Sequence, residues 1–139
     1  MLNEKKTYEI AVLDSFRVLL PDFPKGVLFP GESPDFILSL TPRTKIGIEL
    51  TRLNQRVLDS NLFSFENIAA CLSSKEEKLD LYKRKKLQEY WLILVVGESL
   101  DKPRFNLHNK LTKWVFESGF KRVFLFDVSR NRIYGLQTD

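Results

Sequence analysis

The sequence predicts an α/β protein with a mixed central sheet flanked by helices on both faces. Apolar residues recur with helical spacing in some segments and alternate with polar residues in others. Residues 90–96 and 123–127 are apolar without alternation, which is typical of strands covered on both faces. A helical segment separates residues 90–96 from the strand before it, which implies a parallel, right-handed crossover. A chain of 139 residues is expected to form one domain, residues 1–139.

Composition limits the function classes. Hydrophobic residues make up 43% of the chain, which excludes a disordered tail as its main content. Lysine and arginine number 22 against 18 acids, and the net charge of +4 permits a polyanionic partner without requiring one. Cys71 is the single cysteine and has no second thiol to pair with, which fits a reducing cytoplasm. The N-terminus lacks the apolar core of a signal peptide and no run has membrane-spanning length, so we expect a cytoplasmic protein with no membrane partner.

The first element is expected to be a helix from about residue 4 to residue 20, ended by Pro21 and Pro24. Glu9 lies within it beside apolar neighbours and is its best candidate for a site residue. A short strand at residues 27–29 follows. Five residues of the helix share one stripe that should face the core: Tyr8, Ala11, Val12, Ser15 and Leu19.

The next segment is expected to form a hairpin that turns at Thr41-Pro42-Arg43, because apolar and polar residues alternate on either side of this turn. With three residues at the tip, Leu40 faces Thr44 and Phe36 lies opposite Ile48. One face of the hairpin is then wholly apolar. Slipping the pairing by one residue would mix the two faces, which a buried sheet resists.

The same register brings two carboxylates together on the other face. Asp35 falls opposite Glu49 with Cβ atoms ~5 Å apart, and two like charges that close repel unless a cation lies between them. Oxygen ligands and the open space left by Gly47 suit Mg²⁺ or Mn²⁺. Taken alone, the hairpin favours two solvated acids on the exposed side of a sheet. Helices over both faces favour a shielded metal site instead.

The rest of the chain is expected to contain two more helices and three more strands. The first helix, residues 63 to about 90, is interrupted at Ser73-Ser74, where the spacing of a capping box occurs. The second helix is capped by Asn106 and ended by Gly119. The strands are residues 90–96, residues 123–127 and an edge strand at residues 132–136.

Pro34-Asp35, followed after the hairpin by Glu49-Leu50-Thr51, resembles the motif of the PD-(D/E)XK nuclease superfamily, also called restriction-endonuclease-like. The order of elements extends the resemblance over about residues 4 to 127 and implies an αβββαβ core. The resemblance implies that Asp35 and Glu49 bind Mg²⁺ or Mn²⁺ and that the backbone carbonyl of Leu50 adds a ligand. It also implies that Glu9, from the first helix, completes the shell.

One position departs from the family pattern, because Thr51 stands where the family has a lysine. A threonine hydroxyl can orient water but supplies no positive charge. Some members of the superfamily recruit the lysine from the following helix, and Lys75 and Lys78 resemble that arrangement. Lys75 has the helical phase and the depth to approach Glu49, and Lys78 is the second choice.

The resemblance implies a metal-dependent phosphodiesterase that acts on nucleic acid as an endonuclease, with DNA as the expected partner. No residue distinguishes DNA from RNA, and cutting both strands of a duplex would favour a homodimer. Two alternatives stay open because of Thr51: an inactive nuclease-like module that binds nucleic acid or a protein, and an accessory subunit that needs its partner. Five cations are candidates for contacts to the phosphate backbone: Arg52, Lys102, Arg104, Lys110 and Lys113.

Overall fold

A mixed sheet of seven strands runs through the described part of the chain, which in this computed structural model comprises residues 3–32, 34–53, 65–79, 87–96, 111 and 113–138. The strand order across the sheet does not follow the chain, since it places the fifth strand at one edge, beyond the seventh. In chain order the elements are α1 (Glu4–Leu19), β1 (Val27–Pro30), β2 (Phe36–Thr41), β3 (Thr44–Arg52), α2 (Phe65–Glu76), β4 (Glu89–Val96), β5 (Val115–Phe116), β6 (Arg122–Asp127) and β7 (Arg132–Thr138).

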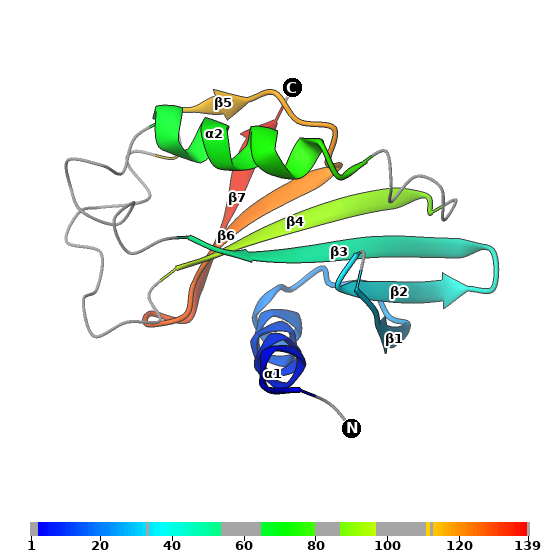
Figure 1. Cartoon of the computed structure of the whole chain (residues 1–139). Helices are drawn as coiled ribbons and strands as arrows, with labels where there is room; N and C mark the ends of the chain where they lie inside the picture. Colours follow the sequence, from blue (N-terminus) through cyan, green and yellow to red (C-terminus); the bar gives the residue numbers. More distant parts are fainter. Residues whose placement is uncertain are drawn as a thin grey trace.

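The sheet has the order β1-β2-β3-β4-β6-β7-β5. Strands β1, β2 and β3 pair antiparallel, whereas β3, β4 and β6 pair parallel. Helix α2 lies between β3 and β4 in the chain, as the parallel crossover requires. Figure 1 shows α1 on one side of the sheet and α2 on the other. The predicted α/β class and the mixed sheet between helices are therefore confirmed.

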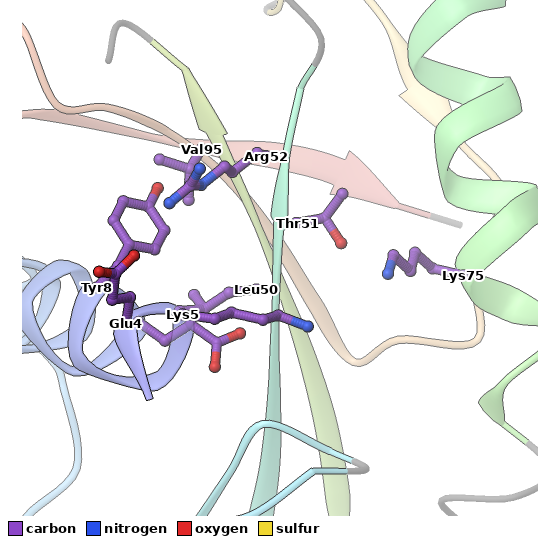
Figure 2. Close-up of a pocket in the computed structure, with 9 residues that line it drawn as sticks. Glu4, Lys5, Tyr8, Leu50, Thr51, Arg52, Lys75 and Val95 are labelled. Carbon is purple, nitrogen blue, oxygen red and sulfur yellow. The ribbon is translucent and has the colours of Figure 1, made fainter. Parts of the chain in front are cut away.

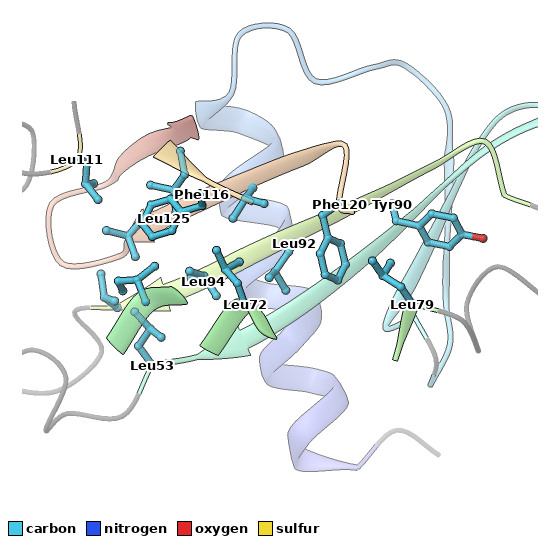
Figure 3. Close-up of a cluster of buried hydrophobic side chains, with 14 residues drawn as sticks. Leu53, Leu72, Leu79, Tyr90, Leu92, Leu94, Leu111, Phe116, Phe120 and Leu125 are labelled. Atoms are coloured by element: carbon cyan, nitrogen blue, oxygen red, sulfur yellow. The ribbon is translucent and has the colours of Figure 1, made fainter. Parts of the chain in front are cut away.

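Each face of the sheet carries its own apolar core, because alternate residues of a strand point to opposite faces. From β4, Leu92 and Leu94 pack with Leu72 on the α2 side, as Figure 3 shows. Trp91 and Ile93 of the same strand belong to the cluster on the α1 side. This double burial explains why β4 reads as an uninterrupted apolar run.

Helix α1 buries a different stripe from the one predicted. Val12 is buried as predicted, but Glu9, Leu13 and Phe16 are buried with it, whereas Ala11, Ser15 and Leu19 of the predicted stripe are exposed. The reason is the size of Phe16, whose ring lies 5.1 Å from that of Phe124, centroid to centroid, and is fully enclosed. One large ring in the core outweighs several smaller side chains in setting the rotation of a helix.

Two other sequence-based boundaries are wrong. Helix α2 runs through Ser73-Ser74 without the predicted interruption and ends at Glu76, because Leu72 and its neighbours on the same face pack against the sheet. Residues 63–64 and 80–86 of the helix predicted from 63 to about 90 lie outside the described part of the chain. The helix predicted to reach Gly119 is replaced, after Leu111, by β5, which pairs with β7. Packing decided this second case, since the ring of Phe116 stacks on that of Phe65 in α2 with centroids 4.8 Å apart.

Strand β7 is consequently not the edge strand that was predicted, because β5 lies outside it. The residues of the predicted helix between Asn106 and Lys110 lie outside the described part of the chain. Of the two described helices, neither combines the length and the apolar character that crossing a bilayer demands.

Candidate functional site

The β2–β3 hairpin has the predicted register from Phe36 to Ser39. Phe36 pairs with Ile48, and three further pairs follow in step toward the tip. The tip itself differs, because Thr41 rather than Leu40 pairs with Thr44. The Thr41 hydroxyl accepts the Thr44 N–H at 3.0 Å, which stabilises a tight turn and leaves Leu40 as a bulge. The predicted three-residue tip is therefore wrong, but the register beside the two acids is confirmed.

Asp35 and Glu49 meet at the open end of this hairpin, and both are buried, with 7% and 4% of their surface exposed. The Asp35 Oδ2 atom accepts the Leu50 N–H at 2.9 Å, and the Asp35 carboxyl also hydrogen-bonds to that of Glu49. Burial, reinforced by this hydrogen bond and by the charge of Glu49, raises the pKa of Asp35 from 3.8 to about 7. The Leu50 N–H and the charge of Lys6 oppose the rise. Near neutral pH Asp35 thus keeps its proton in part of the molecules.

The acids lie where β3 extends beyond the first residue of β2, its antiparallel partner. Strand β2 begins at Phe36, opposite Ile48, so in the described structure residues 49–52 pair only with β4. The N–H and C=O of one strand residue point to the same edge. The carbonyl of Leu50 therefore faces the same edge as its N–H, which contacts Asp35.

Side chains from this part of β3 alternate between the two faces of the sheet. Leu50 belongs to the cluster on the α1 side, so Glu49 and Thr51 point toward α2. Lys75 reaches in from α2, and its Nζ lies 3.9 Å from Glu49 Oε2 with 19% of the side chain exposed. Lys78 is exposed and lies beyond the end of the helix. The Thr51 hydroxyl is shielded from solvent and has no hydrogen-bonding partner among the residues that the structure describes.

Glu9 lies on α1 close to the site and forms an ion pair with Lys6. Lys6 Nζ lies 2.9 Å from Glu9 Oε1 and also donates to the carbonyls of Gly31, at 2.6 Å, and Asp35, at 3.1 Å. Lys6 therefore ties the helix to the turn that carries Asp35. Sequence reasoning missed this residue, although its spacing of three from Glu9 was a signal that the two share one helix face.

Gly47 does not provide the open space that was expected beside the acids. A Cβ atom at this position would lie 2.8 Å from Leu87 Cδ1 and 2.9 Å from Pro34 Cγ. The glycine is needed because other side chains already fill this space. The free volume lies further along β3 instead.

A pocket of about 570 Å³ opens at the carboxyl ends of β3 and β4. Helix α1 lines it with Lys5, Tyr8 and Glu9, β3 lines it with residues 50–52, and α2 contributes Lys75. Figure 2 shows Lys5 and Lys75 extending toward β3 from the two helices. Open α/β sheets commonly bind ligands in such a crevice beyond the carboxyl ends of the strands.

The predicted phosphate-backbone contacts do not gather in one place. Arg52 lines the pocket, whereas Lys113 is exposed next to β5, and β4, β6 and β7 separate β5 from β3. The other three candidates, Lys102, Arg104 and Lys110, lie outside the described residues.

The donor set was compared with what a divalent cation needs. Over the described ranges, no group of three or more His, Cys, Asp or Glu side chains could hold a metal ion. Asp35 and Glu49 supply two carboxylates, and the Leu50 carbonyl lies on the same edge. Mg²⁺ is usually bound through one or two carboxylates and keeps several waters, so this set fits it.

Comparisons with known proteins add no relative, because no family model, curated protein or solved structure matches the chain. The chemistry of the site must therefore be deduced from its own residues. Those residues are a buried acid pair, Lys75 beside it, and a pocket that Lys75 lines together with Thr51.

Proposed function

We propose that this chain is a metal-dependent phosphodiesterase that hydrolyses nucleic acid, an endonuclease-like domain of the PD-(D/E)XK type. The observation that carries the proposal is the buried pair Asp35 and Glu49 at the unpaired edge of β3, with Lys75 Nζ 3.9 Å from Glu49. The chain order from α1 through β1, β2 and β3 to α2 and β4 matches an αβββαβ core and supports the same reading.

Asp35, Glu49 and the carbonyl of Leu50 would hold Mg²⁺ or Mn²⁺. The chemistry that such an ion supplies is a lower pKa for bound water and neutralisation of charge at the phosphate. Binding requires an ionised Asp35 carboxylate, so the proton on Asp35 must leave first. Lys6 keeps Asp35 in place through its backbone, and Glu9 holds Lys6.

Lys75 takes the role of the motif lysine, which the family has at the position of Thr51. Its ammonium group comes from α2 and lines the same pocket as Thr51, so it is available to offset the charge that develops on a phosphate bound there. The Thr51 hydroxyl is free to orient a water molecule. DNA is the substrate we expect, and a homodimer would allow both strands of a duplex to be cut.

The direct test is cleavage of labelled single-stranded and duplex DNA and RNA with Mg²⁺, with Mn²⁺ and with EDTA. We expect cleavage only with metal, and a loss of at least about 100-fold in Asp35→Asn and Glu49→Gln, because each removes a ligand charge. Asp14→Asn is the matched control, since Asp14 is an exposed acid on α1. Cleavage that continues in both site variants, or in EDTA, would contradict the proposal.

A second candidate is a binding module that has lost catalysis, either acting alone or as an accessory subunit. The observation that favours it is the small donor set, with two acids and a threonine in place of the motif lysine. Calorimetry with Mn²⁺ separates the two candidates. Binding of Mn²⁺ that Glu49→Gln abolishes supports the enzyme, whereas nucleic-acid binding without any Mn²⁺ binding supports the module.

A further inference from the structure

Arg52, the last residue of β3, lies stacked on an aromatic ring at the rim of the pocket. Its guanidinium carbon is 3.5 Å from the centroid of the Tyr8 ring, and Tyr8 belongs to α1. Stacking fixes the plane of a guanidinium and leaves its N–H groups pointing outward in that plane. This is the geometry in which arginine binds a phosphate through two hydrogen bonds.

Arg52 and the catalytic candidates occupy opposite faces of the same strand end. Thr51 points toward α2, where Lys75 and Glu49 lie, whereas Arg52 points toward α1 and Tyr8. The pocket connects the two faces around the unpaired edge of β3. A chain of linked phosphates that crosses this edge within the pocket would therefore meet Thr51 and Lys75, next to Glu49, on one side and Arg52 on the other.

The charges that line the pocket favour an anion on the α1 side. Lys6 offsets the charge of Glu9, and Glu49 offsets that of Lys75. Of the side chains that line the pocket, three are basic, Lys5, Arg52 and Lys75, and two are acidic, Glu4 and Glu9. Figure 2 shows Arg52 and Tyr8 together beside β3, with Lys5 extending toward the same strand.

We propose that Lys5 and the Arg52–Tyr8 stack form a subsite for a phosphate of the nucleic-acid strand next to the phosphate that is cut. The subsite deepens the proposed function and rests on it. It makes Arg52 a substrate-binding residue and Tyr8 a positioning residue that acts through Arg52. A free phosphate or a mononucleotide would present the same phosphate chemistry. The experiment distinguishes these small ligands from a nucleic-acid strand.

The test measures binding of a short fluorescein-labelled single-stranded DNA by anisotropy, with EDTA present so that no cleavage occurs. We expect Arg52→Gln to weaken binding about tenfold at low salt and to reduce the slope of log Kd against log salt by about one contact. Arg52→Lys should recover part of the affinity, because it keeps the charge and loses the two-pronged geometry. Arg43→Gln, at the exposed hairpin tip, is the matched control and should change nothing.

Tyr8→Leu tests the positioning of Arg52 separately from its charge. If Arg52 acted only as a surface charge, this substitution would not change DNA binding. It removes no charge, yet we expect it to weaken binding about threefold or more because the guanidinium loses its platform, while Tyr8→Phe keeps wild-type affinity. The unfolding midpoint of each variant checks that it is folded. If Tyr8→Leu does not fold, Arg52→Lys still decides, because full retention of affinity would exclude a geometric role.

Three results would overturn the subsite: Arg52→Gln that behaves like Arg43→Gln, Tyr8→Leu with unchanged affinity, or displacement of the DNA by inorganic phosphate or a mononucleotide at equal concentration. The cleavage assay separates this failure from failure of the proposed function. Binding that depends on Arg52 in a protein that never cleaves DNA supports the subsite and rejects the nuclease. Cleavage that does not depend on Arg52 supports the nuclease and rejects the subsite.

Discussion

Asp35 is a residue whose ionisation depends strongly on the fold. Its pKa rises from 3.8 to about 7, mainly because the carboxyl is buried, and secondly because Glu49 lies against it. Between these two pH values the unfolded chain has lost the Asp35 proton, whereas the folded protein keeps it. The folded state then binds more protons, so the free energy of unfolding falls as the pH rises from about 4 to about 7.

The first prediction follows from this linkage. The decrease attributable to Asp35 is on the order of 1 kcal/mol per pH unit in this range, and Asp35→Asn should remove it. Urea denaturation at several pH values between 4 and 8, in EDTA, measures the effect. Asp14→Asn serves as the control and should keep the wild-type dependence. Equal pH dependence in wild type and Asp35→Asn would contradict the burial argument.

A second prediction concerns the two lysines of the α2 region. Lys75→Met should lower the cleavage rate about 100-fold, because it removes the cation beside Glu49 where a phosphate would gain charge. Lys78→Met should leave the rate unchanged, since Lys78 is exposed beyond the helix. Single-turnover rates with saturating DNA separate chemistry from binding. Equal rates in Lys75→Met and Lys78→Met would contradict a specific role for Lys75 at the phosphate.

At this scale, the meeting of the two acids was predictable and the role of Lys6 was not. Alternation of apolar residues determines the register, and the register places Asp35 beside Glu49 whatever their function. Lys6 binds backbone carbonyls of a turn 25 and 29 residues away in the chain. Such contacts follow from how α1 is rotated on the sheet, and a large ring in the core decided that rotation.

At the scale of elements, the sheet was easier to predict than the helices. The hairpin and the buried strands carry strong signals, because alternation and unbroken apolar runs have few other readings. The helix expected to reach Gly119 is replaced after Leu111 because residues 115–119 contact α2 and β7 instead. The ring of Phe116 stacks on Phe65, and Gly119 N–H donates to Glu76 Oε1 at 2.9 Å. Both contacts are tertiary, so local periodicity could not reveal them.

The third prediction uses the packing around β3. Gly47→Ala should lower the free energy of unfolding by about 1–3 kcal/mol, because the added methyl would overlap Leu87 and Pro34. Gly135→Ala, in β7, is the matched control, since nothing lies within 4 Å of the added atom. There we expect no loss, or a gain of up to about 1 kcal/mol, because alanine suits a strand better. Chemical denaturation of both variants provides the comparison.

On the scale of the whole molecule, two cores share one sheet. Residues of β4 and β6 alternate between the α1 side and the α2 side, so each strand is clamped by both clusters. Damage to either cluster should therefore weaken the same cooperative unit rather than release one helix alone.

This arrangement gives the fourth prediction. Phe16→Ala on one side should cost about 3–5 kcal/mol and Leu72→Ala on the other about 2–5 kcal/mol, each shifting a single unfolding transition. Val18→Ala should change stability by less than about 0.5 kcal/mol, since Val18 is 85% exposed. Far-UV circular dichroism and tryptophan fluorescence should give coincident curves. Two separate transitions in either core variant would show that the faces unfold independently.

Residues 49–52 of β3, which pair only with β4 among the described strands, have a consequence for solubility. A bare strand edge is a template on which a second chain can add a strand and begin an aggregate. Here the Asp35 carboxylate already occupies the Leu50 N–H, and charged groups of Glu49, Lys75 and Arg52 surround the edge. The residues proposed to bind metal and phosphate would thereby also prevent a second copy of this protein from adding a strand at this edge.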